Sequence, residues 1–140
     1  MTGLNEKNGS CLCGAVGITA KNPSNKVGAC HCGMCRKWGG GPFMEIDCGT
    51  DISFTGEENI TVYNSSSWAE RGFCKKCGSH LFYRLKGNGQ HMVAVGLFDD
   101  QEGLVFNSQV FIDKKPSFYS FVNKTNDMTE AEIFEMYGSS

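Results

Sequence analysis

The 140-residue sequence has no long apolar run, no surplus of basic charge and no internal repeat. Because no apolar run approaches the roughly 20 residues that cross a bilayer, we expect no membrane-spanning helix. The polar start, residues 1–10, has no apolar core of the kind found in signal peptides, so we expect no secretory signal. A net charge of −2 provides no electrostatic footprint for nucleic acid. Without a linker or low-complexity run, residues 1–140 are predicted to form a single domain.

Cysteine is the residue that stands out, with eight in the chain. Cysteines without a secretory signal are typical of a reducing compartment, where they bind metal more often than they pair as disulfides. We therefore expect a soluble, cytoplasmic metalloprotein that has no membrane or nucleic-acid partner. The pattern leaves the oligomeric state open.

The densest cysteine motif is Cys-His-Cys-Gly-Met-Cys-Arg at residues 30–36. Zinc binds thiolates tetrahedrally at about 2.3 Å, and structural sites are normally closed by four protein ligands. Cys30, Cys32 and Cys35 would leave the fourth position open, which is the arrangement of a catalytic zinc. The alternatives are a reduced cluster without metal and a redox-active triple.

Two further cysteine pairs flank this motif. Cys11 and Cys13 fall in a strand predicted over residues 9–18, where they share a face and must lean together to hold one ion. Cys74 and Cys77 form a Cys-x-x-Cys-Gly knuckle. Neither pair can close a site alone, but together they supply the four thiolates of a closed zinc site. The spacing also allows the pairs to combine with the central motif in another way.

The eighth cysteine, Cys48, has a different setting. Residues 42–48 alternate, so that Cys48 and the apolar side chains share one face of a strand while Glu45 and Asp47 take the other. Free cysteine is among the most buried residue types, so we predict that Cys48 is a core thiol.

The other predicted elements are short. Strands are expected at residues 52–54, 60–63, 81–85, 91–98 and 110–112. A helical turn over residues 32–38 should stop at the glycines that follow it. Residues 129–132 read Thr-Glu-Ala-Glu, which is a capping box at the start of a short C-terminal helix.

Three motifs in order carry a family resemblance: Gly-Ser-Cys-x-Cys-Gly-x-Val from residue 9, the central motif, and Phe-Cys-x-x-Cys-Gly-Ser from residue 73. They resemble the motifs of the glutathione-dependent formaldehyde-activating enzyme family, whose superfamily includes centromere protein V. The similarity extends to residues 96–100 and 129–132, so it spans nearly the whole chain. Any one motif alone would be weak, but three in order are specific.

The resemblance implies a mainly β fold, a zinc-stabilised β-tent of small antiparallel sheets with a short C-terminal helix. It implies a structural zinc at Cys11, Cys13, Cys74 and Cys77. It also implies a second, exchangeable and catalytic zinc at Cys30, Cys32 and Cys35, which makes two zinc ions per chain.

The family's founding activity is reversible carbon–sulfur bond formation between glutathione and formaldehyde, which yields S-hydroxymethylglutathione. We therefore expect a carbon–sulfur lyase whose partner is a small thiol such as glutathione. The chain departs from the family near Gln109 and Phe118, where histidine and tryptophan are frequent, and it looks shorter than the founding enzymes. These departures bear on the substrate more than on the fold.

A zinc with four thiolates carries net charge −2, which a neighbouring cation would offset. The candidates are Arg36, Lys37 and Arg71, and we assign Arg36 a catalytic role because its fork suits a substrate carboxylate. Lys37 is better interpreted as a solvated surface charge. His31 would act in proton transfer, replace a ligand, or have no direct role.

Two rival functions compete with a carbon–sulfur lyase. A methionine sulfoxide reductase of the related zinc fold needs a nucleophilic cysteine outside the metal sites, and only Cys48 is spare. No basic residue adjoins Cys48 in the sequence to favour its thiolate. A non-catalytic, zinc-folded adaptor or chaperone would need only four ligands, so the additional open triple disfavours it.

Overall fold

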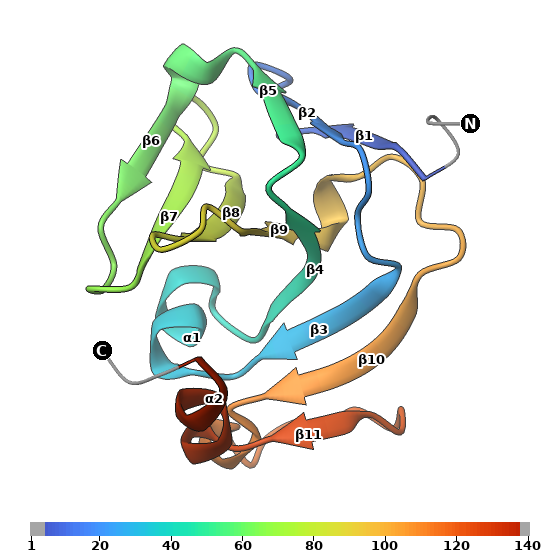
Figure 1. Ribbon diagram of the computed structural model, residues 1–140, viewed down its shortest axis with the longest axis vertical. Coiled ribbons are helices and arrows are strands. Elements are labelled where there is room, and N and C mark those ends of the chain that lie inside the picture. Colours follow the sequence, from blue (N-terminus) through green and yellow to red (C-terminus); the bar gives the residue numbers. More distant parts are fainter. Residues whose placement is uncertain (1–4, 138–140) are drawn as a thin grey trace.

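The computed structural model describes residues 5–137, which form two β-sheets (Figure 1). The smaller sheet is antiparallel, with strand order β1-β2-β5. Its strands are β1 (Lys7–Ser10), β2 (Gly17–Ala20) and β5 (Ile52–Thr55).

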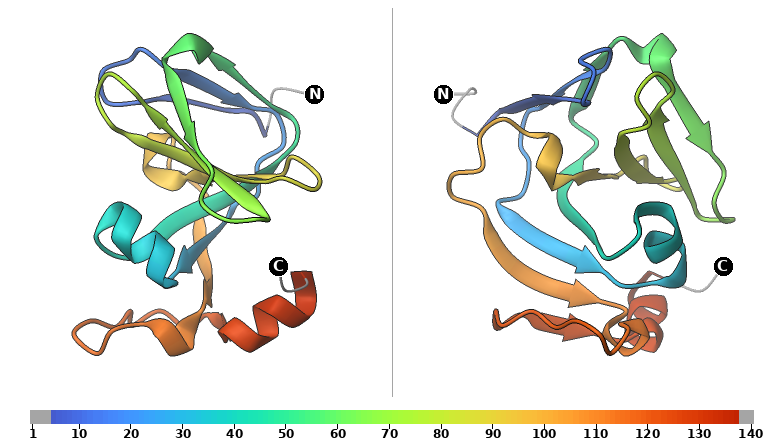
Figure 2. Two further views of the ribbon diagram at one scale, coloured as in Figure 1. Left: turned by 90° about the vertical axis from the view of Figure 1, so that its left-hand side faces the viewer. Right: turned by 180° about the vertical axis from the view of Figure 1, so that it is seen from behind.

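The larger sheet has eight strands in the order β11-β10-β3-β4-β9-β8-β7-β6. Neighbours pair antiparallel except β10, which is parallel to both β3 and β11. Figures 1 and 2 show the sheet curling, so that β6 to β8 and β10 to β11 lie at opposite ends of an arc with β4 between them. Its strands are β3 (Lys26–Cys30), β4 (Phe43–Gly49), β6 (Ile60–Tyr63), β7 (Ala69–Cys74), β8 (His80–Leu85), β9 (His91–Ala94), β10 (Val105–Val110) and β11 (Asn126–Met128).

The helices are short. The Thr129 amide donates to the Glu132 carboxylate at 2.8 Å and the Glu132 amide donates to the Thr129 hydroxyl at 3.2 Å, which confirms the capping box. Gly40 ends the central helix with a φ of +87°, a conformation that glycine adopts without steric cost. The helical elements are α1 (Gly33–Gly39), α2 (Glu130–Tyr137) and the 3₁₀ turns η2 (Glu57–Asn59), η3 (Val95–Leu97) and η4 (Ile112–Lys114).

The mainly β class with small antiparallel sheets and a C-terminal helix is confirmed, but three strand predictions were wrong in detail. Residues 9–18 form a hairpin rather than one strand, with the cysteine pair in its turn. The strand predicted over residues 91–98 ends at Ala94 and continues as η3. The strand predicted at 110–112 lies earlier, as β10, and η4 follows it. Apolar runs report burial, and burial alone does not distinguish a strand from a 3₁₀ turn.

The core lies between the sheets. Cys48 is 2% exposed within it, which confirms the prediction of a core thiol. Its largest fully buried members include Val16, Ile46, Leu81 and Phe82. A second apolar cluster gathers Cys30, Cys35, Phe43, Phe111 and Ile133 beneath α2. None of the helices within residues 5–137 has the length and apolar character needed to cross a membrane.

Candidate metal centres

Two groups of cysteines converge in space. The first, called here the four-thiol cluster, joins the β1–β2 turn to the β7–β8 turn and consists of Cys11, Cys13, Cys74 and Cys77. Its sulfur atoms all lie within 4.8 Å of one another. The Sγ atom of Cys13 lies 3.7 Å from the Sγ atom of Cys11 and 3.8 Å from that of Cys74. Both distances are close to the roughly 3.8 Å edge of a tetrahedron with zinc–sulfur bonds of about 2.3 Å. The donor set and spacing fit a closed tetrahedral zinc.

The turns that hold this cluster share a design. Gly14 and Gly78 follow the second cysteine of each pair with φ of +81° and +79°, where a side chain would be strained. The Leu12 amide donates to the Ser79 hydroxyl at 3.0 Å and links the two turns directly. The same hydroxyl lies 3.2 Å from Cys77 Sγ and, together with the backbone amides of Ser79 and Cys13, lowers the pKa of Cys77 to about 5, which favours the thiolate that a metal requires.

The second group, the three-thiol cluster, consists of Cys30, Cys32 and Cys35. Cys30 ends β3, Cys32 caps α1, and Cys35 lies in the first turn of α1. The Cys35 amide donates to Cys32 Sγ at 3.3 Å. The three sulfur atoms also lie within 4.8 Å of one another. Within residues 5–137, no fourth cysteine, histidine or carboxylate joins them at that distance. The donor set fits a zinc with one position left open.

The pKa values of the three thiols are shifted in different directions. Hydrogen bonding with Cys30, and then with Cys35, lowers the pKa of Cys32, while hydrogen bonding with Cys32, and then with Cys35, raises the pKa of Cys30. The cluster therefore favours a thiolate at Cys32. Thiolate is the form that binds zinc.

Arg71 is the cation beside these sulfur atoms. It is buried, and its Nη1 donates to Cys35 Sγ at 3.5 Å. Its guanidinium lies over the rings of Trp38 at 5.0 Å and Tyr83 at 5.6 Å, which hold it in place. Burial is the largest single influence and acts to lower the pKa of Arg71, but the charge and hydrogen bond of Cys35 together with the charges of Cys32 and Cys30 outweigh it, and the net shift is upward. Arg71 therefore remains a cation at the cluster.

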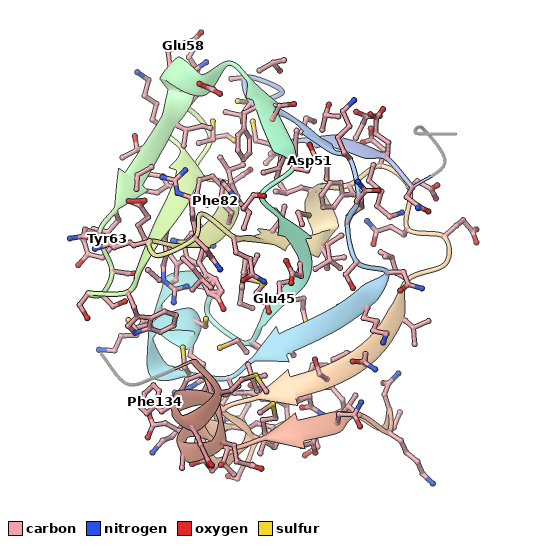
Figure 3. The ribbon with its side chains drawn as sticks, in the orientation of Figure 1. Glu45, Asp51, Glu58, Tyr63, Phe82 and Phe134 are labelled. Atoms are coloured by element: carbon pink, nitrogen blue, oxygen red, sulfur yellow. The ribbon has the colours of Figure 1, made fainter. Side chains whose placement is uncertain are left out.

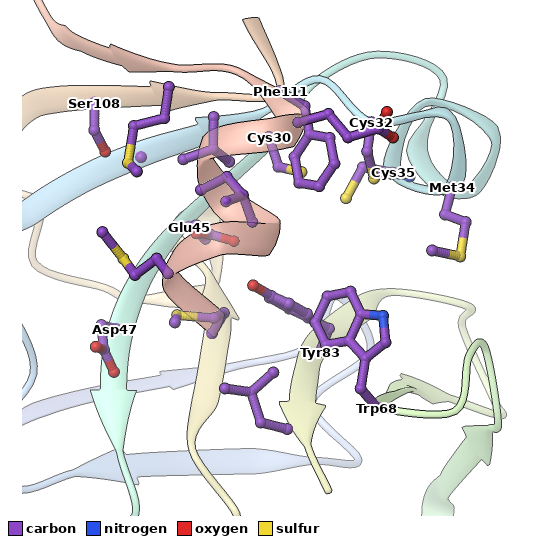
Figure 4. A pocket seen from close by; sticks show the side chains of 18 of the residues that line it. Cys30, Cys32, Met34, Cys35, Glu45, Asp47, Trp68, Tyr83, Ser108 and Phe111 are labelled. Carbon is purple, nitrogen blue, oxygen red and sulfur yellow. Dashed lines mark hydrogen bonds between the residues drawn. The ribbon is translucent and has the colours of Figure 1, made fainter. Parts of the chain in front are cut away.

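A cavity of about 790 Å³, called here the chamber, opens over the three-thiol cluster (Figure 4). Its floor comes from β3, β4 and β10, and α2, β8 and the loop before β7 contribute the walls. All three cysteines and Arg71 line it, whereas Arg36 is not among the described residues that do.

Arg36 and His31 instead support the loop from outside the chamber. Arg36 Nε donates to the His31 carbonyl at 3.0 Å. The His31 ring is fully buried, with Nε2 2.8 Å from Gln109 Oε1 and Nδ1 2.8 Å from the Tyr119 hydroxyl. Burial lowers the pKa of His31. Both ring nitrogens are engaged, so His31 fixes the loop between Cys30 and Cys32.

One carboxyl of the chamber had no assigned role in the sequence. Alternation along β4 places Glu45 and Asp47 opposite Cys48, as predicted, and both carboxyl groups line the chamber. Figure 3 labels Glu45 on β4. Glu45 Oε2 is shielded from solvent and has no hydrogen-bond partner among the described residues. Burial, and then the charge of Asp47, raises the pKa of Glu45 to about 8.

Phe111 forms the chamber wall beside the cysteines with a strained backbone. Its φ of +56° is the only positive value among the described residues other than glycine, and such a conformation costs roughly 1–3 kcal/mol. Its ring packs edge-on against Phe134 of α2, with ring centroids 6.0 Å apart. The strain turns an aromatic ring onto the cluster and gives α2 a surface to dock on.

Comparison with known proteins agrees with this architecture. The sequence profile described as glutathione-dependent formaldehyde-activating enzyme matches residues 6–114. A Schizosaccharomyces pombe protein named as an uncharacterized lyase is 40% identical over 131 residues, which are 93% of this chain and 96% of the relative. A crystal structure of a Rhodobacter sphaeroides protein aligns with a TM-score of 0.57 and 28% identity, covering 66% of this chain and 87% of that one.

Proposed function

The chain belongs to the glutathione-dependent formaldehyde-activating enzyme family, and we propose that it is a zinc-dependent carbon–sulfur lyase acting on the adduct of a thiol and an aldehyde. The observation that carries the proposal is the three-thiol cluster, which is one ligand short of a closed site and faces a chamber. A lyase function agrees with the name of the yeast relative.

The two clusters would hold zinc for different purposes. The four-thiol cluster would hold a structural ion that clamps the β1–β2 turn to the β7–β8 turn. The three-thiol cluster would hold an exchangeable ion that, when bound, accepts a thiol and keeps it deprotonated at neutral pH.

The protein's own groups prepare this centre for an anionic sulfur. Arg71 offsets the negative charge of the cluster from below, through its contact with Cys35. His31, held by Gln109 and Tyr119, fixes the backbone between the first two thiols. The chamber walls are largely apolar, so these interactions act in a lower dielectric than that of bulk water.

The rival functions fit the geometry less well. A sulfoxide reductase would need Cys48 as its nucleophile, but Cys48 is buried in the core and burial raises its pKa to about 12. A purely structural adaptor has no use for a second, incomplete cluster beside a chamber.

The first test is metal content. Protein purified without chelator should contain two zinc ions, one of which a mild chelator removes while the fold persists. The Cys32→Ser variant should retain one zinc. A single, non-exchangeable zinc that reconstitution cannot supplement would contradict the catalytic-metal assignment.

The second test is activity. With glutathione and formaldehyde at equilibrium, magnetisation transfer between free and adduct carbon in NMR reports carbon–sulfur exchange. We expect the two-zinc protein to accelerate this exchange and Cys32→Ser to leave it at the uncatalysed rate. In the cobalt-substituted protein, addition of thiol should intensify the sulfur-to-cobalt bands. Failure of formaldehyde and of every other aldehyde with glutathione, cysteine and mercaptoethanol would refute the lyase proposal.

A further inference from the structure

We propose that the chamber binds an aldehyde with an apolar substituent, and that Glu45 transfers the proton at its carbonyl oxygen. This inference rests on the proposed function and narrows it to a substrate class. It assigns Glu45 a catalytic role, because the carboxyl would contact the reacting oxygen.

The walls of the chamber match an apolar substituent. They present aliphatic and aromatic side chains, among them Trp68, Leu85, Met92, Ile133 and Phe134. A volume of about 790 Å³ lies in the range of pockets that enclose drug-sized molecules, so formaldehyde would leave most of it unfilled. An aldehyde with a hydrocarbon chain or ring would instead displace water from these walls.

The charges of the chamber fit the carboxylates of glutathione poorly. Its charged lining outside the cysteines comprises two cations and three carboxyl groups: Lys26, Arg71, Glu45, Asp47 and Glu130. Of the cations, Arg71 already serves Cys35. A thiol with two carboxylates would therefore keep its charged ends toward solvent, and the chamber would receive the aldehyde part of the adduct.

The floor contains a polar notch beside the thiols. Gly28 of β3 pairs with Glu45 on one side and Ser108 on the other, so these residues form one row across three strands. A Cβ on Gly28 would lie 3.0 Å from Ser108 Oγ and 3.6 Å from Glu45 Oε1, so the glycine keeps the space between them open. Cys30 lies two residues along β3 on the same face, about 6.6 Å away along the strand. Figure 4 shows Glu45 between Asp47 and Cys30.

Glu45 differs from its neighbour Asp47 in having a carboxyl oxygen that is free to form a further hydrogen bond among the described residues. Asp47 accepts hydrogen bonds from Gln90 Nε2 at 2.6 Å and from the Gly49 amide at 2.8 Å, whereas Glu45 Oε2 has no partner among the described residues. A shielded carboxyl oxygen without a partner is costly, so it is expected where a ligand supplies the partner.

The protonation state of Glu45 also suits the role. The titratable and charged groups that line the chamber with it are Asp47 on its own strand, Lys26 of the neighbouring β3, Arg71 of β7, Glu130 of α2 and the three-thiol cluster. With its pKa raised to about 8, Glu45 can both give and take a proton near neutral pH.

The step balances without an external reagent. In the lyase direction the adduct RS–CH(OH)R′ loses its hydroxyl proton to the Glu45 carboxylate, the C=O bond forms, and the carbon–sulfur bond breaks with its electron pair on sulfur. In the reverse direction the thiolate sulfur attacks the carbonyl carbon while protonated Glu45 gives the proton to oxygen.

The test compares aldehydes in the NMR exchange assay with two-zinc protein and glutathione. We expect kcat/KM for hexanal and for benzaldehyde to exceed that for formaldehyde by at least about tenfold, since each buried methylene favours binding. Catalysis of formaldehyde exchange without catalysis of either apolar aldehyde, or with equal kcat/KM for all three, would overturn the substrate class and leave the proposed lyase intact. Absence of exchange with all three aldehydes and all three thiols would instead remove the lyase proposal itself.

Variants separate the wall from the floor. Phe134→Ala should reduce hexanal exchange about tenfold and leave formaldehyde exchange within threefold, whereas Tyr63→Ala, at an exposed aromatic residue of β6 outside the chamber lining, should change neither. Glu45→Gln should reduce exchange of every aldehyde at least about a hundredfold at unchanged zinc content. Its control is Glu70→Gln, whose carboxylate pairs with Arg84 outside the chamber. Retention of exchange by Glu45→Gln would overturn the catalytic role of Glu45. An unaltered aldehyde preference in Phe134→Ala would overturn the proposal that the apolar chamber wall binds the aldehyde substituent.

Discussion

The two cysteine clusters use the same ligand chemistry in opposite settings. The four-thiol cluster lies between two turns, and Cys13 is exposed there although its set of ligands is complete. The three-thiol cluster has two buried members and lies at the floor of a chamber, yet its set is one ligand short.

The comparison teaches that exposure does not make a thiol cluster reactive. The four-thiol cluster can tolerate solvent because its four thiolates would leave a bound zinc no open position. The three-thiol cluster has a different surrounding: a buried cation at Cys35, an unpartnered carboxyl at Glu45 and a strained backbone at Phe111. Each of these features costs stability in isolation, and such costs are typical of functional sites.

The largest expected effect separates the clusters by stability. Cys77→Ser should abolish stable folding, because structural zinc supplies on the order of 10 kcal/mol in small zinc domains and total stability is only about 5–15 kcal/mol. Cys32→Ser should lose no more than about 2 kcal/mol. Circular dichroism and urea unfolding measure the difference. Equal unfolding of both variants would end the division into a structural and a catalytic cluster.

The second effect is a gain in the free energy of unfolding rather than a loss, and it depends on pH. Because the folded pKa of Glu45 is raised to about 8, the folded state binds an extra proton between pH 4.5 and 8. The contribution of Glu45 to stability is therefore fully present below pH 4.5 and is lost as pH rises through 8. Glu45→Gln, which cannot ionise, should be more stable than the wild type by a few kcal/mol at pH 9 and nearly equal at pH 5.

Urea unfolding of the two proteins at both pH values measures this difference. Both proteins contain the same cysteines, so proton release on metal binding cancels in the comparison. A difference that is the same at pH 5 and pH 9 would show that the Glu45 carboxyl is not held protonated by its surroundings.

The third effect distinguishes the two arginines near the three-thiol cluster. Arg71→Met should weaken zinc binding at that cluster about 10–100-fold, since it removes the cation that contacts Cys35. Arg36→Ala should weaken it less than about threefold, because Arg36 bonds only a backbone carbonyl. Chelator competition measures both affinities. A larger loss in Arg36→Ala would restore the role that the sequence motif suggested for it.

The smallest effect concerns the hydrogen bond between Gln109 and His31, which supports the loop between Cys30 and Cys32. Gln109→Leu leaves His31 Nε2 buried without its partner, which should cost about 1–2 kcal/mol of unfolding free energy. The four-thiol cluster should keep its zinc affinity, because Gln109 lies on β10, away from both of its turns. An unchanged unfolding free energy would mean that the hydrogen bond contributes nothing to the loop.

The sequence by itself determined the cysteine motifs of both clusters and the family. Cysteine spacing and glycine placement are local properties, so the knuckle at Cys74 and Cys77 and the open motif at residues 30–36 could be predicted from neighbours in the chain. The same holds for the capping box at Thr129 and for the alternation that buries Cys48, both of which are confirmed.

Only the tertiary structure decided what surrounds those cysteines. Residues 9–18 fold as a hairpin because β1 and β2 pair with each other and β5 completes the sheet, and such long-range pairing is not visible in a local pattern. Arg71 rather than Arg36 contacts the thiols, because the Arg71 side chain on β7 reaches Cys35 of α1. These two residues are 36 positions apart in the sequence, so no local pattern connects them. Glu45 becomes a candidate catalyst only when β3, β10 and α2 enclose it, since burial and the loss of water as a partner arise from packing between distant segments.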